Sequence, residues 1–175
     1  MSSHPTIRVG IISDTHGHLD ARIVEVLSGC DISVHAGDIM DGGVLESMKS
    51  ATDEIIAVRG NNDIPGLWRT DNNNALQDLG DEAFFSLPGG DVVVLHGHEH
   101  GPKPCHSSMR ECYPKARLII YGHSHKLVCD HDLQPWVVNP GAAGLTRNHG
   151  GPSCLVLEAS ESSWEISQHR FPDTK

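Results

Sequence analysis

The sequence predicts an α/β fold in which two sheets pack face to face and helices cover their outer faces. In the first third of the chain, short apolar runs alternate with helical spacing of apolar residues, which is typical of parallel strands joined by helical crossovers. From residue 82 onward, short strand patterns follow one another at hairpin distances. Strand-rich parts of this kind bury their apolar faces against each other, with helices outside. A chain of 175 residues is long enough for one such core, so we expect a single domain over residues 1–175.

The first part of the chain alternates strands and helices. The apolar run from Val9 to Ile12 is short and rich in β-branched residues, which predicts a buried strand. Leu19, Ile23 and Leu27 then recur at helical spacing, and Gly29 is a suitable C-terminal stop. The pattern predicts strand, helix, strand, helix and strand, in this order, over residues 9–12, 17–29, 32–35, 42–50 and 55–58.

The second part is richer in strands. Residues 61–81 are rich in Asn, Asp, Gly and Pro, which predicts a long irregular surface loop. After this loop, Pro88-Gly89-Gly90 is a turn between the two strands of a hairpin, and a short helix is expected at 107–113. The strands are expected at 82–87, 91–95, 118–121, 126–132, 136–139, 153–158 and 164–170, and we expect them to be mostly antiparallel.

The charge balance bears on the partners of the chain. The sequence holds 23 acidic and 13 basic residues, and its formal net charge of −10 repels polyanions at long range. We therefore expect no bulk nucleic-acid binding. The 13 histidines are a high count, and divalent ions held by them would supply a local positive charge that attracts a phosphate.

The cysteines and the apolar content bear on location. The five cysteines, at positions 30, 105, 112, 129 and 154, form no CxxC motif, which argues against a disulfide framework and a thiolate zinc site. No apolar run approaches the roughly eighteen residues that cross a bilayer. The first residues lack the basic and apolar segments of a secretory signal. We expect a soluble cytoplasmic protein without membrane contacts, and a homo-oligomer is compatible with the sequence.

Side chains able to bind metal ions follow one predicted strand after another. Asp14 and His16 follow the first strand, and Asp38 follows the second. Because open α/β sheets place their chemistry at the carboxyl ends of the strands, we expect these side chains to meet at one edge. The full set comprises two carboxylates, one amide and four histidines: Asp14, His16, Asp38, Asn61, His96, His123 and His125.

A set of this size predicts two metal ions, because it exceeds what one ion in a protein usually takes. Two dications held about 3.5 to 4 Å apart repel each other and need a bridging carboxylate, for which Asp38 is well placed. In two-metal hydrolases the ions polarise the phosphoryl oxygens and lower the pKa of a bound water, which becomes the nucleophile of an in-line attack. Nitrogen and oxygen ligands suit manganese, which we expect, and also iron, zinc, cobalt or nickel.

Five motifs occur in a fixed order: Asp14-x-His16, Gly37-Asp38, Gly60-Asn61-Asn62-Asp63, His96-Gly97-His98 and Gly122-His123-Ser124-His125. With them the chain resembles the calcineurin-like metallophosphoesterases, most closely their small single-domain phosphodiesterase branch. Asn139-Pro140-Gly141 and Arg147 extend the resemblance toward the C-terminus. The resemblance implies a four-layer αββα sandwich with two mixed sheets flanked by helices. It also implies a metal-dependent phosphoric ester hydrolase, a phosphodiesterase rather than a monoesterase, with a small phosphate ester as its substrate.

The resemblance further implies which side chains share an ion. Asp14, His16 and His125 would hold one ion. Asn61, His96 and His123 would hold the other, and Asp38 would bind both.

The chain departs from the larger family at Asn62. Many family members have Gly-Asn-His-Glu, whose histidine is thought to protonate the leaving group, and this acid is missing here. His98, two residues after a ligand position, is our candidate for the role, and Arg147 is our candidate for binding a phosphate oxygen. We expect the remaining nearby histidines to be structural or surface residues: His18, His35 and His100.

The alternative function is a non-catalytic scaffold. The retromer subunit that resembles the family has the same fold with altered ligand positions. A single histidine or aspartate is usually a satisfied polar group or a helix cap. Seven such residues in register are not explained in that way, and all seven positions are intact in this chain, which favours the enzyme.

Overall fold

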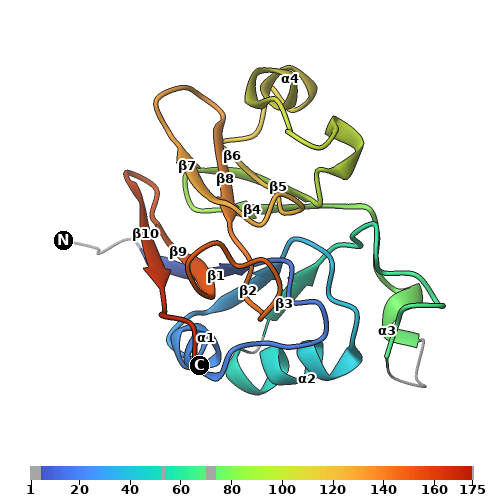
Figure 1. Cartoon of the computed structure of the whole chain (residues 1–175). Coiled ribbons are helices and arrows are strands. Elements are labelled where there is room, and N and C mark those ends of the chain that lie inside the picture. The colour runs from blue at the N-terminus through green and yellow to red at the C-terminus, as the bar shows by residue number, and fades with distance from the viewer. Residues whose placement is uncertain (1–4, 53, 70–73, 175) are drawn as a thin grey trace.

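The computed structural model describes residues 5–52, 54–69 and 74–174, which form two five-stranded sheets stacked face to face (Figure 1). Two helices lie below the first sheet and one lies above the second, so the layers run helix, sheet, sheet, helix. The predicted αββα sandwich is therefore confirmed. The helices of the outer layers are α1 (Ala21–Leu27), α2 (Gly42–Ala51) and α4 (His106–Cys112). Among the described residues, no helix is long and apolar enough to cross a membrane.

The first sheet combines the beginning and the end of the chain. Its strand order is β10-β9-β1-β2-β3, with β1 in the centre. β1 pairs in parallel with β2 and antiparallel with β9, and β2 pairs in parallel with β3. The strands are β1 (Ile7–Ile12), β2 (Ile32–His35), β3 (Glu54–Ala57), β9 (Ser153–Ala159) and β10 (Trp164–Arg170).

The second sheet has the order β4-β5-β6-β8-β7. Its inner strands β5, β6 and β8 are parallel, whereas β4 and β7 pair antiparallel at the edges. The prediction of a mostly antiparallel half is wrong for these inner strands, because α4 lies in the connection from β5 to β6 and a helical crossover joins parallel strands. The strands are β4 (Glu82–Leu87), β5 (Gly90–Leu95), β6 (Leu118–Ile120), β7 (Leu127–Asp130) and β8 (Trp136–Pro140).

Several elements differ from the prediction, most clearly one helix start and two short helical turns. α1 begins at Ala21 rather than near residue 17, because the Asp20 carboxylate accepts the Arg22 N–H at 2.9 Å and caps the helix. In the predicted irregular segment 61–81, α3 (Asn74–Gln77) forms a single helical turn, and residues 70–73 lie outside the described part. A short 3₁₀ helix, η1 (His98–His100), was also not expected.

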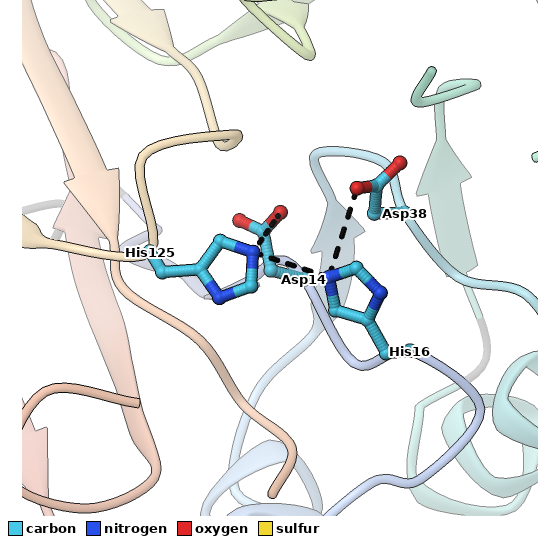
Figure 2. A group of neighbouring side chains, drawn as sticks. All are labelled: Asp14, His16, Asp38 and His125. Atoms are coloured by element: carbon cyan, nitrogen blue, oxygen red, sulfur yellow. Dashed lines mark hydrogen bonds and ion pairs between the residues drawn. The ribbon is translucent and has the colours of Figure 1, made fainter. Parts of the chain in front are cut away.

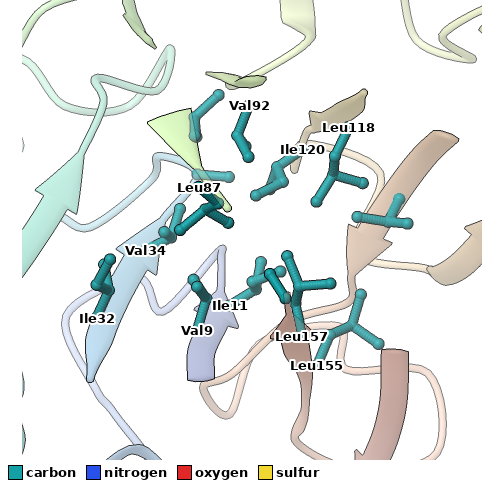
Figure 3. Packing of buried hydrophobic residues seen from close by; sticks show 14 of the residues in the cluster. Val9, Ile11, Ile32, Val34, Leu87, Val92, Leu118, Ile120, Leu155 and Leu157 are labelled. Carbon is teal, nitrogen blue, oxygen red and sulfur yellow. The ribbon is translucent and has the colours of Figure 1, made fainter. Parts of the chain in front are cut away.

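The main core lies between the two sheets (Figure 3). Val9 and Ile11 of β1 are fully buried there against residues of β6 such as Ile120. Successive strand side chains point to opposite faces, so Ile12 lies with Ile23 in a second core, between the first sheet and helices α1 and α2. With both faces covered, the strands are fixed in register, and the loops at their ends are held by a rigid frame.

Candidate metal centre

The seven side chains predicted from the strand ends come together at one edge of the seam between the sheets. Asp14 and His16 follow β1, and Asp38 follows β2. The remaining members follow β3, β5 and β6: Asn61, His96, His123 and His125. Gly122 and Gly60 allow the backbone of their loops to approach side chains of the neighbouring loops closely. A Cβ at Gly122 would lie 2.0 Å from Ser13 Oγ, and one at Gly60 would lie 2.2 Å from Asp38 Oδ1.

Asp38 lies between two histidines. Its Oδ2 is 3.7 Å from His16 Nε2, and its Oδ1 is 3.5 Å from His96 Nε2. Figure 2 shows the first of these pairs, with the Asp38 carboxylate directed at the His16 ring. The side chain is 2% exposed, so each carboxylate oxygen faces a different imidazole in a buried setting.

One group of donors surrounds Asp14. Its Oδ1 lies 3.4 Å from His125 Nε2, which in turn lies 3.1 Å from His16 Nε2 (Figure 2). One ligand atom from each of Asp14, His16, Asp38 and His125 falls within 4.8 Å of the others. The distances among these four side chains are compatible with a single cation.

A second group surrounds Asn61. Its Oδ1 lies 3.2 Å from His96 Nε2 and 3.2 Å from His123 Nδ1. The rings of His96 and His123 are 5.3 Å apart between centroids. Asp38 Oδ1 is the nearest carboxylate oxygen to His96, so Asp38 adjoins both groups.

The histidines are oriented by their outward-facing nitrogens. His96 Nδ1 lies 2.7 Å from the Ala36 carbonyl, and His125 Nδ1 lies 3.0 Å from the Thr146 carbonyl, so both nitrogens must carry the proton and donate it. His16 Nδ1 faces the Met40 sulfur at 3.1 Å. With the proton on Nδ1, a neutral His96 or His125 ring presents the lone pair of Nε2 to the site, which is the arrangement of metal-binding histidines.

Electrostatics also favour a bound cation. Burial lowers the pKa of His16 and His123, and it lowers the pKa of His125 to about 4, so these imidazoles are neutral at physiological pH. Burial raises the pKa of Asp14 to about 7. For His96, burial is outweighed by the Asp38 and Asp14 carboxylates, which raise its pKa. Metal binding requires these groups without their protons, so an ion would displace the protons of Asp14 and His96.

The donors present therefore fit divalent ions. Asp14 Oδ2 accepts the Ser13 hydroxyl at 2.7 Å, but Asp14 Oδ1 is buried and has no hydrogen-bond partner among the described residues. An unpaired carboxylate oxygen in a buried site is costly unless a cation binds it. Carboxylate, amide and imidazole donors are the types that manganese, iron or zinc accept.

The backbone of the site is held in an uncommon conformation. Five of the seven side chains named above belong to residues with left-handed φ angles between 47° and 67°: Asp14, His16, Asp38, His123 and His125. Such conformations cost on the order of 1 kcal/mol or more each and cluster at functional sites. The surrounding frame must therefore stabilise them.

Asn62 holds the Asp38 side chain and Asp63 holds the backbone beside it, and sequence reasoning missed both roles. Asn62 donates its backbone N–H to Asp38 Oδ1 at 2.9 Å and its side-chain amide to Oδ2 at 2.8 Å. Although burial raises it, hydrogen bonds from His96 and Asn62 hold the pKa of Asp38 well below its usual range. Asp63 is 1% exposed and accepts the backbone N–H groups of Ile39, Met40 and Gly60. The one available signal in the sequence was an acidic residue, Asp63, directly after the pair Asn61-Asn62.

Asn139 has a structural role at the same edge of the sheets. Its amide donates to the Gly122 carbonyl at 2.7 Å and to Ser124 Oγ at 3.1 Å, while its Oδ1 accepts the Gly141 N–H at 2.9 Å. The Asn-Pro-Gly segment after β8 thus supports the loop that carries His123 and His125.

His98 and Arg147 lie beside different groups of donors. The His98 ring is 5.5 Å from the His96 ring between centroids, and its buried Nδ1 has no hydrogen-bond partner among the described residues. Arg147 Nη2 lies 3.4 Å from His125 Nε2. His100 occupies the end of η1 and is not among the described contacts of the cluster.

His35 is buried beneath the site. Its Nδ1 accepts the Gly37 N–H at 3.2 Å, so Nε2 must carry the ring proton, and this nitrogen lies 2.9 Å from the Thr15 hydroxyl. The ring is 0% exposed. His35 therefore joins the loops after β1 and β2 and does not point into the donor cluster.

We expect His35 to make the protein sensitive to acid. Burial, reinforced by the charge of His96, lowers the pKa of His35 from 6.5 to about 3. Below about pH 6.5 the unfolded chain therefore binds a proton that the folded protein does not, so stability is complete above this pH and falls as the pH drops toward 3. Between about pH 7.5 and about pH 5, this group alone should remove about 2 kcal/mol from the free energy of unfolding.

The contribution of His35 to the free energy of unfolding is measured by urea unfolding of the metal-free wild type and of His35→Gln at both pH values. The other titrating groups are shared, so the loss between the two pH values should be about 2 kcal/mol smaller in the variant. Equal losses would show that His35 is not kept neutral by burial.

Residues 7–162 match the family model of the calcineurin-like phosphoesterase superfamily domain. The phosphodiesterase MJ0936 of Methanocaldococcus jannaschii is 30% identical over 148 residues, which cover 77% of this chain and 83% of that protein. The probable metallophosphoesterase YsnB of Bacillus subtilis is 28% identical over 160 residues, which cover 86% of this chain and 83% of that protein.

Solved structures share the fold at lower identity. An archaeal phosphodiesterase superposes with a TM-score of 0.71 at 22% identity, over 93% of this chain and 100% of that one. Vps29 of Entamoeba histolytica, in a structure with zinc, superposes with a TM-score of 0.74 at 16% identity, over 95% of this chain and 99% of that one. At these identities the likeness concerns the arrangement of the chain.

Proposed function

Because the chain belongs to the calcineurin-like phosphoesterase superfamily, we propose that it is a phosphodiesterase that uses two divalent metal ions. The metal-dependent phosphoesterase class follows from the family, and the phosphodiesterase name of the relative MJ0936 supports the preference for diesters. The position of Asp38 is the observation that carries the proposal of two ions. Its oxygens face His16 at 3.7 Å and His96 at 3.5 Å, as a carboxylate between two cations would.

Each group of donors would hold one ion. Asp14, His16 and His125 form the first group, and Asn61, His96 and His123 form the second, with Asp38 contributing to both. When bound, the ions would neutralise phosphoryl oxygens and lower the pKa of water. The chain itself supplies rigidity: the Nδ1 hydrogen bonds of His96 and His125 fix their rings before substrate arrives.

Arg147 and His98 would act on the substrate from opposite ends of the site. The Arg147 guanidinium, 3.4 Å from His125 Nε2, can donate two parallel hydrogen bonds to a phosphate. Asn62 cannot release a proton, and its amide is already used to hold Asp38. His98 is the remaining candidate for the general acid, and its unpartnered buried Nδ1 is compatible with contact to a leaving group.

We expect His98→Ala to affect leaving groups unequally. An alkyl leaving group of high pKa must be protonated as its bond to phosphorus breaks, so its rate should fall about 10²-fold. A p-nitrophenyl group leaves as a stable anion and should be affected little. Rates of wild type and variant on diesters of graded leaving-group pKa measure the difference.

His100→Ala, which changes the same short helix away from the cluster, is the matched control. An equal loss across the series in His98→Ala would instead assign His98 to phosphate or metal binding.

The metal content and turnover test the proposed function as a whole. Protein purified without chelator should contain about two ions per chain and should hydrolyse bis(p-nitrophenyl) phosphate. We propose manganese as the preferred ion, with iron, zinc, cobalt or nickel as alternatives to compare. Near-zero metal together with no turnover on diesters, monoesters and cyclic nucleotides would favour the scaffold.

We propose a cytoplasmic location, a single domain and a small phosphate ester as the partner. All five cysteines are free thiols in the structure, which is typical of a reducing compartment.

A further inference from the structure

The two ends of the proposed site differ in the charged side chains that lie beside them. The His16 and His125 rings, 4.9 Å apart between centroids, mark one end, where Arg147 lies. The His96 and His98 rings mark the other end. Beside them is a cavity of about 330 Å³, whose lining includes three carboxylates: Asp81, Glu82 and Glu99. An anionic part of a substrate is therefore attracted to the first end and repelled from the second.

A second arginine, Arg69, lies near the first end, which His16 and His125 mark. A Cβ built on Gly17, the residue after His16, would lie 2.6 Å from Arg69 Nη1 and 2.9 Å from its Cζ. The guanidinium therefore packs directly on the backbone of the loop that carries His16, in space that only a glycine leaves open. Gly17 has a φ of 84°, which also favours glycine at this position.

The backbone of Arg69 is anchored to the same loops. Its N–H donates to the Met40 carbonyl at 3.0 Å, and the preceding Trp68 is 7% exposed. Met40 in turn contacts His16 Nδ1 through its sulfur at 3.1 Å. The start of the Arg69 side chain is thus fixed relative to His16, although the segment is far from His16 in sequence.

The Arg69 guanidinium has no ion pair or hydrogen bond within residues 5–52, 54–69 and 74–174, although the chain has a net charge of −10. The other arginines near carboxylates are paired, such as Arg22 with Asp20 at 2.8 Å and Arg110 with Asp130 at 2.7 Å. A guanidinium that is exposed and has no partner among the described residues can bind an anion bidentately when it lies beside a phosphate-binding site.

We propose that Arg69 is a specificity-determining residue that binds a second anionic group of the substrate, on the part opposite the leaving group. This inference rests on the proposed function. With the leaving group near His98 and the carboxylate-lined cavity, the other ester substituent extends past His16 toward Arg69. The substrate class is a phosphodiester whose retained part carries a further phosphate or carboxylate.

Two pairs of compounds that differ by one phosphate test the proposal. Thymidine 5′-monophosphate and thymidine 3′,5′-bisphosphate are titrated calorimetrically into the manganese-loaded protein. p-Nitrophenyl thymidine 5′-phosphate and its 3′-phosphorylated form are compared as substrates with the same leaving group. In each pair, wild type should prefer the member with the additional phosphate about tenfold, which is the size of one charge-assisted contact.

Arg69→Gln should lose this preference in both pairs. Lys115→Gln removes the same charge at a distant cavity beside Phe84 and should keep the preference. Equal binding of the two nucleotides by wild type, or a preference that survives in Arg69→Gln, would overturn the assignment. A protein that hydrolyses none of the esters would contradict the proposed function, and the calorimetric comparison would still decide the role of Arg69.

Discussion

Asp38→Asn should abolish turnover and remove metal from both proposed sites. The substitution keeps the size of the side chain but deletes the negative charge that lies between His16 and His96. Without it, two dications would repel each other with no bridging anion. The loss of several kcal/mol of transition-state stabilisation corresponds to a rate decrease on the order of 10³-fold or more. Metal analysis and hydrolysis of bis(p-nitrophenyl) phosphate measure both effects.

His16→Ala and His96→Ala are the matched comparisons, because each belongs to only one group of donors. Each should lose mainly one ion and should retain more activity than Asp38→Asn. Circular dichroism confirms that the variants are folded. An Asp38→Asn protein with two ions and normal turnover would refute the bridging role.

Asp63→Ala should be the most destabilising substitution near the site. The Asp63 carboxylate accepts the Met40 N–H at 2.7 Å, the Gly60 N–H at 2.8 Å and the Ile39 N–H at 3.2 Å. Its removal leaves these backbone donors without partners, at about 1 to 3 kcal/mol for each buried group. A total of about 4 kcal/mol would lower the Tm by about 10 °C. Thermal unfolding of the metal-free protein measures the loss without a contribution from bound ions.

Asp41→Ala provides the control, since Asp41 also accepts a backbone N–H but lies at the exposed start of α2. The loss of this helix cap should cost only about 1 kcal/mol. If the two variants are equally stable, the three hydrogen bonds of Asp63 do not hold the loops together.

The convergence of the donors could be foreseen from the sequence because it depends on strand polarity. Asp14, Asp38 and Asn61 each follow an apolar run, and parallel strands end at a common edge. The layers followed from the same periodicity. The apolar run of β1 was predicted to be buried, and in the structure Val9 and Ile11 lie in the core between the sheets while Ile12 lies in the core beside the helices.

Contacts between loops could not be foreseen, because they have no periodicity. Asn62 was recognised only as a missing acid, whereas its amide holds Asp38, and Asp63 was named in a motif without a role. Arg69 contacts Gly17 because the backbone N–H of Arg69 donates to the Met40 carbonyl, which brings this distant segment next to the loop after β1. The parallel pairing of β6 with β5 and β8 depends on sheet order, which short apolar runs do not encode.

The pairing of β1 with β9 has a consequence for synthesis in the cell. The ribosome produces Asp14 and His16 early, but the strand that flanks them, β9, begins only at Ser153. Until that strand emerges, β1 keeps an unpaired edge, and contacts of such long sequence separation form slowly. A premature stop codon after His125 would leave every proposed ligand in the product. The truncated protein would still lack β9, the neighbour of its central strand. It would therefore be a substrate for quality-control proteases although every proposed ligand is present.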